Sequence, residues 1–172
     1  MSKQIHQMQL RFMPTEDRLL FRLSTSEDNY FQFWFTRRYV KFLWQAIQHM
    51  LHASHAGENE QHTPEVQEAL RSFQHQQALA DTDFDSHYEE SEQPVQPLGD
   101  EPILLTQIQV KPHVDETQLL CLHPEEGEGV EIAMDIQLQH SFVQLLVDAV
   151  SKSEWDLNYS MGEDSKGKPT LN

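Results

Sequence analysis

Apolar and polar residues alternate along three short segments near the start of the chain, at residues 8–12, 19–23 and 30–35. A period of two is expected of β-strands that bury one face. Turn-forming residues separate the segments, among them Pro14 and Asp17. We therefore expect neighbouring strands that pair as an antiparallel meander.

The period then changes to that of an amphipathic helix. Thr36 has a hydroxyl suited to an N-cap. Apolar residues follow at helical spacing: Val40, Leu43, Trp44, Ile47 and Leu51. One β-β-β-α unit is therefore predicted over about residues 5–53.

The same order of patterns recurs about one hundred residues later. Three pairs of segments match in residue type and spacing: 7–11 with 107–111, 18–21 with 118–121, and 31–36 with 130–135. Because the offset falls by one before the last pair, we place a one-residue deletion in the second strand-to-strand turn. Asp135 takes the capping position of the second helix. The pattern predicts a duplicated β-β-β-α unit, with its second copy over about residues 103–160.

The segment between the two copies differs in composition. Residues 63–65 (TPE) are suited to begin a helix, which we expect over about residues 64–80. Residues 81–102 contain many acids and three prolines, so they predict a flexible acidic linker. Residues 161–172 are predicted to form a flexible tail.

Together these elements predict a single pseudo-symmetric α+β domain over residues 1–172, with a helix from each repeat on one face of antiparallel sheet. The pattern leaves open whether the six strands form one sheet or two packed sheets. Cys121 is the single cysteine, and no signal-peptide pattern or long apolar run is present. We therefore expect a cytoplasmic protein without a membrane segment.

Charge is distributed unevenly along a chain whose net charge is −16. Residues 1–53 contain seven Lys/Arg against four Asp/Glu, whereas residues 54–102 contain one against twelve. Residues 103–172 contain four against twelve. The acidic total disfavours non-specific binding of nucleic acid, but the basic first third leaves a local exception.

Two motifs in this basic third resemble a signature of uncharacterised proteobacterial proteins. They are residues 17–22 (DRLLFR) and 33–38 (FWFTRR). The resemblance covers about the first third of the chain. It implies a bacterial cytosolic protein and carries no implication about activity.

The outward face of the first three strands is the main candidate binding surface. It is expected to carry Arg11, Arg18, Arg22, Tyr30 and Trp34. Arginines beside aromatic rings can contact phosphates and stack bases, but the same rings could pack against the second copy while the arginines stay in solvent. Three further cations, Arg37, Arg38 and Lys41, begin the first helix, where the helix dipole disfavours positive charge. They could hold a phosphate or a carboxylate of a partner, or form salt bridges within the fold.

Four histidines form the densest metal-like cluster: His49, His52, His55 and His62. Spacings of three can place imidazoles on one helical face, although histidines near a helix C-terminus are also favoured by the dipole. We predict no metal site from them. Cys121 is expected on the buried face of a strand, as part of the core. No glycine-rich phosphate loop or nucleophile–base pair is evident, so no catalytic residue and no cofactor are predicted.

These features favour a non-enzymatic binding or adaptor protein, with another protein as its partner and a homodimer as one form of that. A single-stranded nucleic-acid-binding protein that uses the basic-aromatic face is the alternative. A small-ligand protein or enzyme is the third hypothesis.

Overall fold

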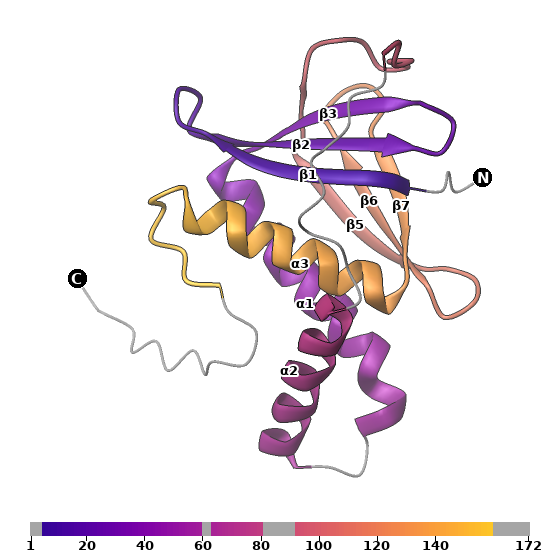
Figure 1. Cartoon of the computed structure of the whole chain (residues 1–172), viewed down its shortest axis with the longest axis vertical. Coiled ribbons are helices and arrows are strands. Elements are labelled where there is room, and N and C mark those ends of the chain that lie inside the picture. The colour runs from indigo at the N-terminus through magenta and orange to yellow at the C-terminus, as the bar shows by residue number, and fades with distance from the viewer. Residues whose placement is uncertain (1–4, 60–62, 81–91, 160–172) are drawn as a thin grey trace.

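The computed structural model describes residues 5–59, 63–80 and 92–159, and it is a mixed α+β structure with two sheets (Figure 1). The first half contains β1 (Ile5–Met13), β2 (Arg18–Thr25), β3 (Tyr30–Phe35) and α1 (Arg37–Asn59). Then come α2 (Pro64–Ala80) and the short β4 (Ile103–Leu104). The second half contains β5 (Gln107–Pro112), β6 (Gln118–His123), β7 (Val130–Met134) and α3 (Ile136–Ser151).

Each half begins with the predicted antiparallel meander. The order of the first sheet is β1-β2-β3-β4, and that of the second is β5-β6-β7. The question left open by the sequence is therefore answered in favour of two sheets. Only two residues separate β4 from β5, so the chain passes directly from the edge of one sheet into the other.

The predicted helix caps are present. The Thr36 hydroxyl accepts a hydrogen bond from the backbone N–H of Tyr39 at 3.1 Å, and the Asp135 carboxylate accepts one from Leu138 at 2.7 Å. Each side chain satisfies a donor that the first turn of a helix leaves without a partner. The helix predicted over residues 64–80 begins at Pro64 and ends at Ala80.

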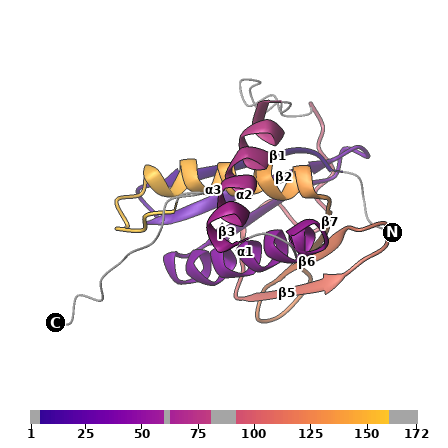
Figure 2. The same cartoon turned by 90° about the horizontal axis from the view of Figure 1, so that it is seen from below.

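The helices pack across the two halves. α3 lies against β1 of the first sheet and α1 lies against β5 of the second, while α1 and α3 also contact each other (Figures 1 and 2). The buried side chains form one cluster with members from both sheets and both helices, including Phe21, Leu43, Leu120 and Phe142. Neither sheet therefore has a core of its own.

Polar contacts join the halves at both ends of this core. The Gln118 amide donates to the Met50 carbonyl and to the Ser54 hydroxyl, each at 2.7 Å. At the other end, the Trp155 indole donates to the Asp17 carboxylate at 2.6 Å. These hydrogen bonds fix the position of each helix on the sheet of the other half.

The second half of the expected linker is held against the first sheet. Val95 exchanges backbone hydrogen bonds with Asp28 and Tyr30, and the Leu105 N–H donates to the Trp34 carbonyl. The linker predicted over residues 81–102 therefore contains a backbone-paired position at Val95, and residues 81–91 lie outside the described structure. Composition indicated a lack of apolar side chains, but edge pairing uses the backbone, and Pro94 and Pro97 are tolerated at an edge.

The pairing register places the one-residue deletion in the first strand-to-strand turn of the second half, whereas the sequence alignment placed it in the second turn. Leu10 pairs with Phe21 and Phe21 with Phe33 in the first sheet. In the second sheet Val110 pairs with Leu120 and Leu120 with Ile132. Paired residues of the first and second strands are separated in sequence by one residue fewer in the second half than in the first. The separation between paired residues of the second and third strands is the same in both halves. Phe21 therefore corresponds in register to Leu120, and the sequence alignment had matched it with Cys121.

Candidate functional site

The outward side of the first sheet gathers five of the predicted binding residues. Met8, Leu10 and Phe12 turn toward the core, so alternate residues turn away from it. The pairing register then sets the outward residues beside one another across β1, β2 and β3. We call this surface the basic face: Gln7, Gln9, Arg11, Arg18, Arg22, Tyr30, Gln32 and Trp34.

Cross-strand neighbours order the side chains of the basic face. Arg22 on the central strand pairs with Gln9 on one side and with Gln32 on the other. One pair further along, Leu20 lies between Arg11 and Trp34 and is 5% exposed. Arg11 is exposed, whereas Arg22 and Trp34 are half-buried. Strands β1, β2 and β3 contain no Asp or Glu, so the cations of this face have no acidic neighbour within the three strands.

The face also contains a buried side-chain oxygen. The Gln9 side-chain oxygen is inaccessible to solvent and accepts no hydrogen bond from the residues that the structure describes. Burying such an acceptor costs free energy, which a donor from a ligand could recover if the side chain rotated outward. The Gln32 amide, by contrast, donates to the Asp100 backbone carbonyl at 3.2 Å.

The remaining predicted cations lie on another surface. Arg37, Arg38 and Lys41 are exposed on α1, whose buried side packs into the core from the inner side of the first sheet. The guanidinium of Arg38 lies 5.9 Å from the centre of the Phe42 ring, a cation–π contact. The structure thus divides the predicted set of eight residues into five on the basic face and three on α1.

The predicted histidine cluster also divides. His49 and His52 are exposed and His62 lies outside the described residues, whereas His55 is buried. His55 instead approaches His140 of α3, with ring centres 5.7 Å apart. His75 of α2 also approaches His140, with ring centres 5.0 Å apart. Three helices therefore meet at three buried histidines that are distant in sequence.

Within this group, the Nδ1 atoms of His75 and His140 are 2.9 Å apart. One must donate and the other accept, so this contact excludes two charged rings. Burial, and to a smaller extent the neighbouring His75 and His55, lower the pKa of His140 to about 4. Burial also lowers the pKa of His75. The contact therefore anchors α2 to α3 through neutral imidazoles.

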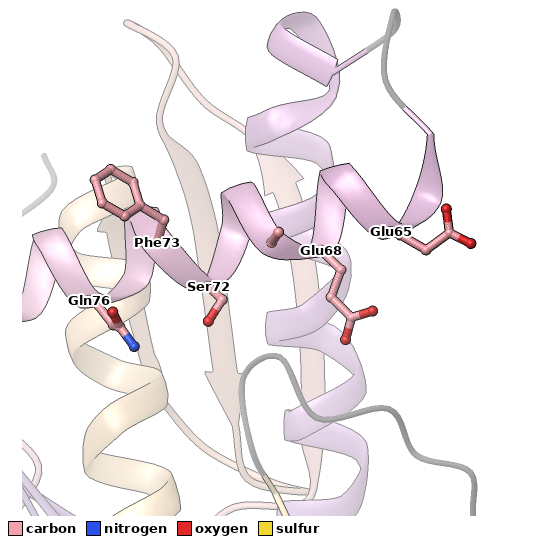
Figure 3. A pocket seen from close by; sticks show the side chains of 6 residues that line it. Glu65, Glu68, Ser72, Phe73 and Gln76 are labelled. Carbon is pink, nitrogen blue, oxygen red and sulfur yellow. The ribbon is translucent and has the colours of Figure 1, made fainter.

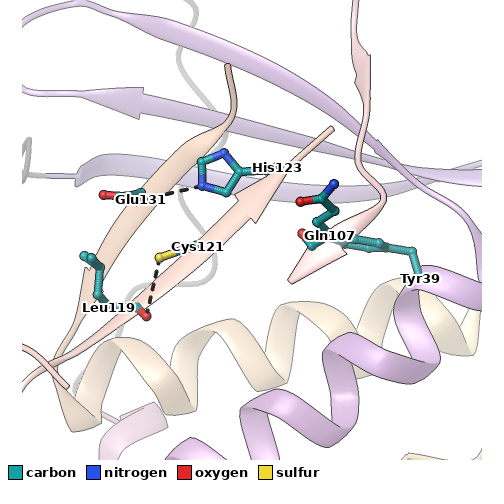
Figure 4. A network of polar contacts seen from close by, with 6 residues as sticks. All are labelled: Tyr39, Gln107, Leu119, Cys121, His123 and Glu131. Carbon is teal, nitrogen blue, oxygen red and sulfur yellow. Dashed lines mark hydrogen bonds and ion pairs between the residues drawn. The ribbon is translucent and has the colours of Figure 1, made fainter. Parts of the chain in front are cut away.

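Cys121 is buried, as predicted, with 1% of its surface exposed. It nevertheless lies on the outward side of the second sheet, opposite to Leu120 and Leu122, and outside the shared core cluster. His123 and Glu131 lie beside it on that side, and Figure 4 shows the three side chains together. The C-x-H spacing in a strand could have indicated this, because alternate residues share a face. The one-residue alignment error concealed it.

The inserted helix α2 has an exposed surface of its own. Val66 and Phe73 are 43% and 63% exposed, and Ala69 is exposed between them. A shallow depression of about 430 Å³ is lined by α2 alone, with Glu65, Glu68, Ser72 and Gln76 among its residues (Figure 3). It is a helix surface and not an enclosed ligand cavity.

Comparison of the chain with protein-family models, curated proteins and solved structures found no match. Within the described ranges, no helix is long and apolar enough to cross a membrane. Function must therefore be inferred from the surfaces themselves.

Proposed function

We propose that the protein binds single-stranded nucleic acid across the basic face. The observation that carries the proposal is the grouping of three arginines and two aromatic residues on one outward sheet surface whose strands lack acids. Arginines contact phosphates, while Tyr30 and Trp34 offer rings on which bases can stack. The glutamines add donors and acceptors for base edges.

The net charge of −16 is compatible with this proposal if the acids lie elsewhere than on the face. Five carboxylates fall within residues 81–91, which lie outside the described structure: Asp81, Asp83, Asp85, Glu89 and Glu90. This segment joins α2 to the strip that pairs with β3. We propose that it competes with nucleic acid for the arginines, which would limit binding to strands that outcompete it.

Fluorescence anisotropy with a labelled oligothymidylate of about 20 nucleotides tests the proposal, because site sizes of such surfaces are about 4–16 nucleotides. We expect binding at low salt that weakens steeply as salt rises. Arg18→Gln with Arg22→Gln should lower the affinity and reduce the salt slope by about one for each phosphate that the variant no longer binds. Trp34→Ala should cost about 1–3 kcal/mol of binding free energy.

The matched control is Lys111→Gln with Lys152→Gln, which removes the same charge from exposed positions elsewhere. It should leave the affinity nearly unchanged at physiological salt, because the interaction between exposed charges more than about 8 Å apart is then largely screened. A second variant replaces the five carboxylates of residues 81–91 by serine or asparagine, and it should bind more tightly. The proposal fails if neither this variant nor the natural chain binds at low salt.

We infer further that the chain arose by internal duplication of a β-β-β-α unit. Three observations support this inference: the equal strand order of the two meanders, the equivalent caps at Thr36 and Asp135, and the reciprocal packing of α1 and α3.

A protease site introduced in place of residues 81–91 tests the shared core. After cleavage the two fragments should migrate together without denaturant, because each sheet depends on the helix of the other half. Fragments that separate and fold alone would contradict it.

A second candidate function, binding of another copy of this chain, is favoured by the exposed apolar residues of α2. In an antiparallel pair of α2 helices centred between residues 69 and 70, Val66 of one copy faces Phe73 of the other. Ala69 lies near the crossing, where a small side chain allows close approach.

Sedimentation velocity over a range of concentrations tests this dimer. The natural chain should associate with rising concentration, while Phe73→Ser should remain monomeric. Phe42→Ser is the matched control, because Phe42 is 54% exposed on α1. A natural chain that stays monomeric at every concentration removes the homodimer hypothesis.

A further inference from the structure

The outward side of the second sheet brings three potential metal ligands together. Cys121 and His123 alternate on β6, and Glu131 of β7 pairs directly with Cys121. Their donor atoms all lie within 4.8 Å of one another, the one such group of three in the part of the chain described. His123 Nε2 is 3.8 Å from Glu131 Oε1, as the dashed line in Figure 4 marks.

We propose that Cys121, His123 and Glu131 bind a divalent transition-metal ion, with Zn²⁺ as the best match. Thiolate, imidazole and carboxylate are all zinc ligands, and three protein ligands leave a fourth position for water or a partner's donor. Ca²⁺ and Mg²⁺ prefer oxygen ligands alone, so this donor set disfavours them.

The geometry requires small movements of the side chains. Tetrahedral zinc with bonds of about 2.0 Å places nitrogen and oxygen ligands about 3.3 Å apart. The observed 3.8 Å between His123 and Glu131 is slightly longer. Both side chains can adjust, because they are 36% and 48% exposed. Cys121 is buried in the central strand of the second sheet, so its sulfur has less freedom to move than the other two ligands.

Gly129 makes room for the histidine. A Cβ atom at this position would lie 2.8 Å from His123 Nδ1 and 2.0 Å from the Leu122 carbonyl oxygen. A side chain here would therefore force both the ring and the backbone to move. The corresponding position in the register of the first sheet is Tyr30, so the glycine itself is specific to the second sheet.

The donor set suits a bound cation, because a Cys121 thiolate and the Glu131 carboxylate would both face it with negative charge. A divalent ion would replace the thiol proton and lie between two negative ligands. The ligands that it needs are thus already neighbours, which limits the cost of organising them.

Cobalt titration of the full chain, after treatment with a chelator, provides a specific test. The chain contains ten histidines that could bind cobalt weakly, but Cys121 is its single cysteine. Absorption from thiolate-to-cobalt charge transfer therefore reports binding at Cys121 alone. We expect this absorption to saturate at one equivalent and to disappear when Zn²⁺ is added. Cys121→Ser should abolish it, and His123→Gln or Glu131→Gln should weaken Zn²⁺ binding by at least about tenfold.

His113→Gln with Glu126→Gln is the matched control, since both residues are exposed in the turns that flank β6. It should change neither the absorption nor the affinity. Circular dichroism without metal should be the same for all variants, which separates loss of a ligand from loss of the fold. The proposal is overturned if no thiolate absorption develops, or if His123→Gln and Glu131→Gln bind Zn²⁺ as tightly as the natural chain.

Discussion

The outward surfaces of the two sheets differ in part of their chemistry. The first carries Arg22, Ser24 and Gln32 at positions where the second, in the same pairing register, carries Cys121, His123 and Glu131. Some outward positions agree between the sheets: Gln7 and Gln9 with Gln107 and Gln109, and Arg11 with Lys111. Inward positions on both sheets are mostly apolar, with Gln118 and Thr25 as exceptions, and they share one core.

This difference indicates which positions the fold constrains. Inward residues must fill the shared core, so both sheets use large apolar side chains there. Outward residues do not contribute to that core and can differ without loss of the fold. Two surfaces of one fold can therefore differ in chemistry, which is the basis of the polyanion site proposed on one sheet and the metal site proposed on the other.

Core truncation tests whether the two faces depend on one core, and it should have the largest effect. Phe21→Ala and Leu120→Ala remove fully buried side chains at corresponding positions. We expect losses of about 3–5 and 2–5 kcal/mol in the free energy of unfolding. Urea denaturation followed by tryptophan fluorescence and circular dichroism should give a single transition for each variant. Gln109→Ala, on the outward side, should change stability by no more than about 0.5 kcal/mol. Two separate transitions would indicate independent sheets.

Exchange of outward residues tests the contrast itself. Arg22→Cys, Ser24→His and Gln32→Glu give the first sheet the ligands of the second. The change removes one positive charge and adds one negative charge, so nucleic-acid affinity should fall on the order of 10- to 100-fold at low salt. Anisotropy measures this loss. An unchanged affinity would show that Arg22 does not contact the strand.

The same exchange should not create a metal site by itself. Tyr30 stands where Gly129 gives the His123 ring its space. We expect thiolate-to-cobalt absorption only after Tyr30→Gly is added, with Cys121→Ser present so that the new cysteine alone reports. Absorption before that addition would mean that Gly129 is not needed for the site.

Acid should weaken the shared core and so affect both faces together. The pKa of His140 is about 4 in the folded protein, below its ordinary value of 6.5. The unfolded chain therefore binds more protons below pH 6.5, and stability falls as the pH decreases from about 6.5 toward 4. From pH 7 to pH 5 the natural chain should lose about 2 kcal/mol more than His140→Phe, as measured by urea denaturation at each pH. Equal losses of unfolding free energy in the two proteins would show that another group causes the acid sensitivity. Binding to the two faces should be compared above pH 6.5, where the fold is at full stability.

The smallest effect is expected from the cations on α1. Arg37→Gln with Arg38→Gln removes the same charge as Arg18→Gln with Arg22→Gln, but from another surface. At about 0.15 M salt, the interaction between exposed charges more than about 8 Å apart is largely screened. The affinity for the oligonucleotide should therefore change by less than about threefold. Comparable losses from the two pairs, measured by anisotropy, would extend the binding surface onto α1.

The sequence alone determined six of the strands, the helices and the basic face, but not β4, which pairs in parallel with β3. Strand alternation, helical spacing and caps such as Thr36 and Asp135 are local signals, because they depend on residues a few positions apart. The basic face could be predicted for the same reason. Once the inward residues of β1, β2 and β3 are known, the outward ones follow from the period of two.

The tertiary structure alone decided which sheet each helix covers and which distant residues meet. His55, His75 and His140 come from three helices, and no local pattern relates them. The position of Cys121 depended on the length of one turn, because a shift of one residue in a strand exchanges its two faces. Such contacts are set by packing between elements far apart in the chain, which sequence spacing does not record.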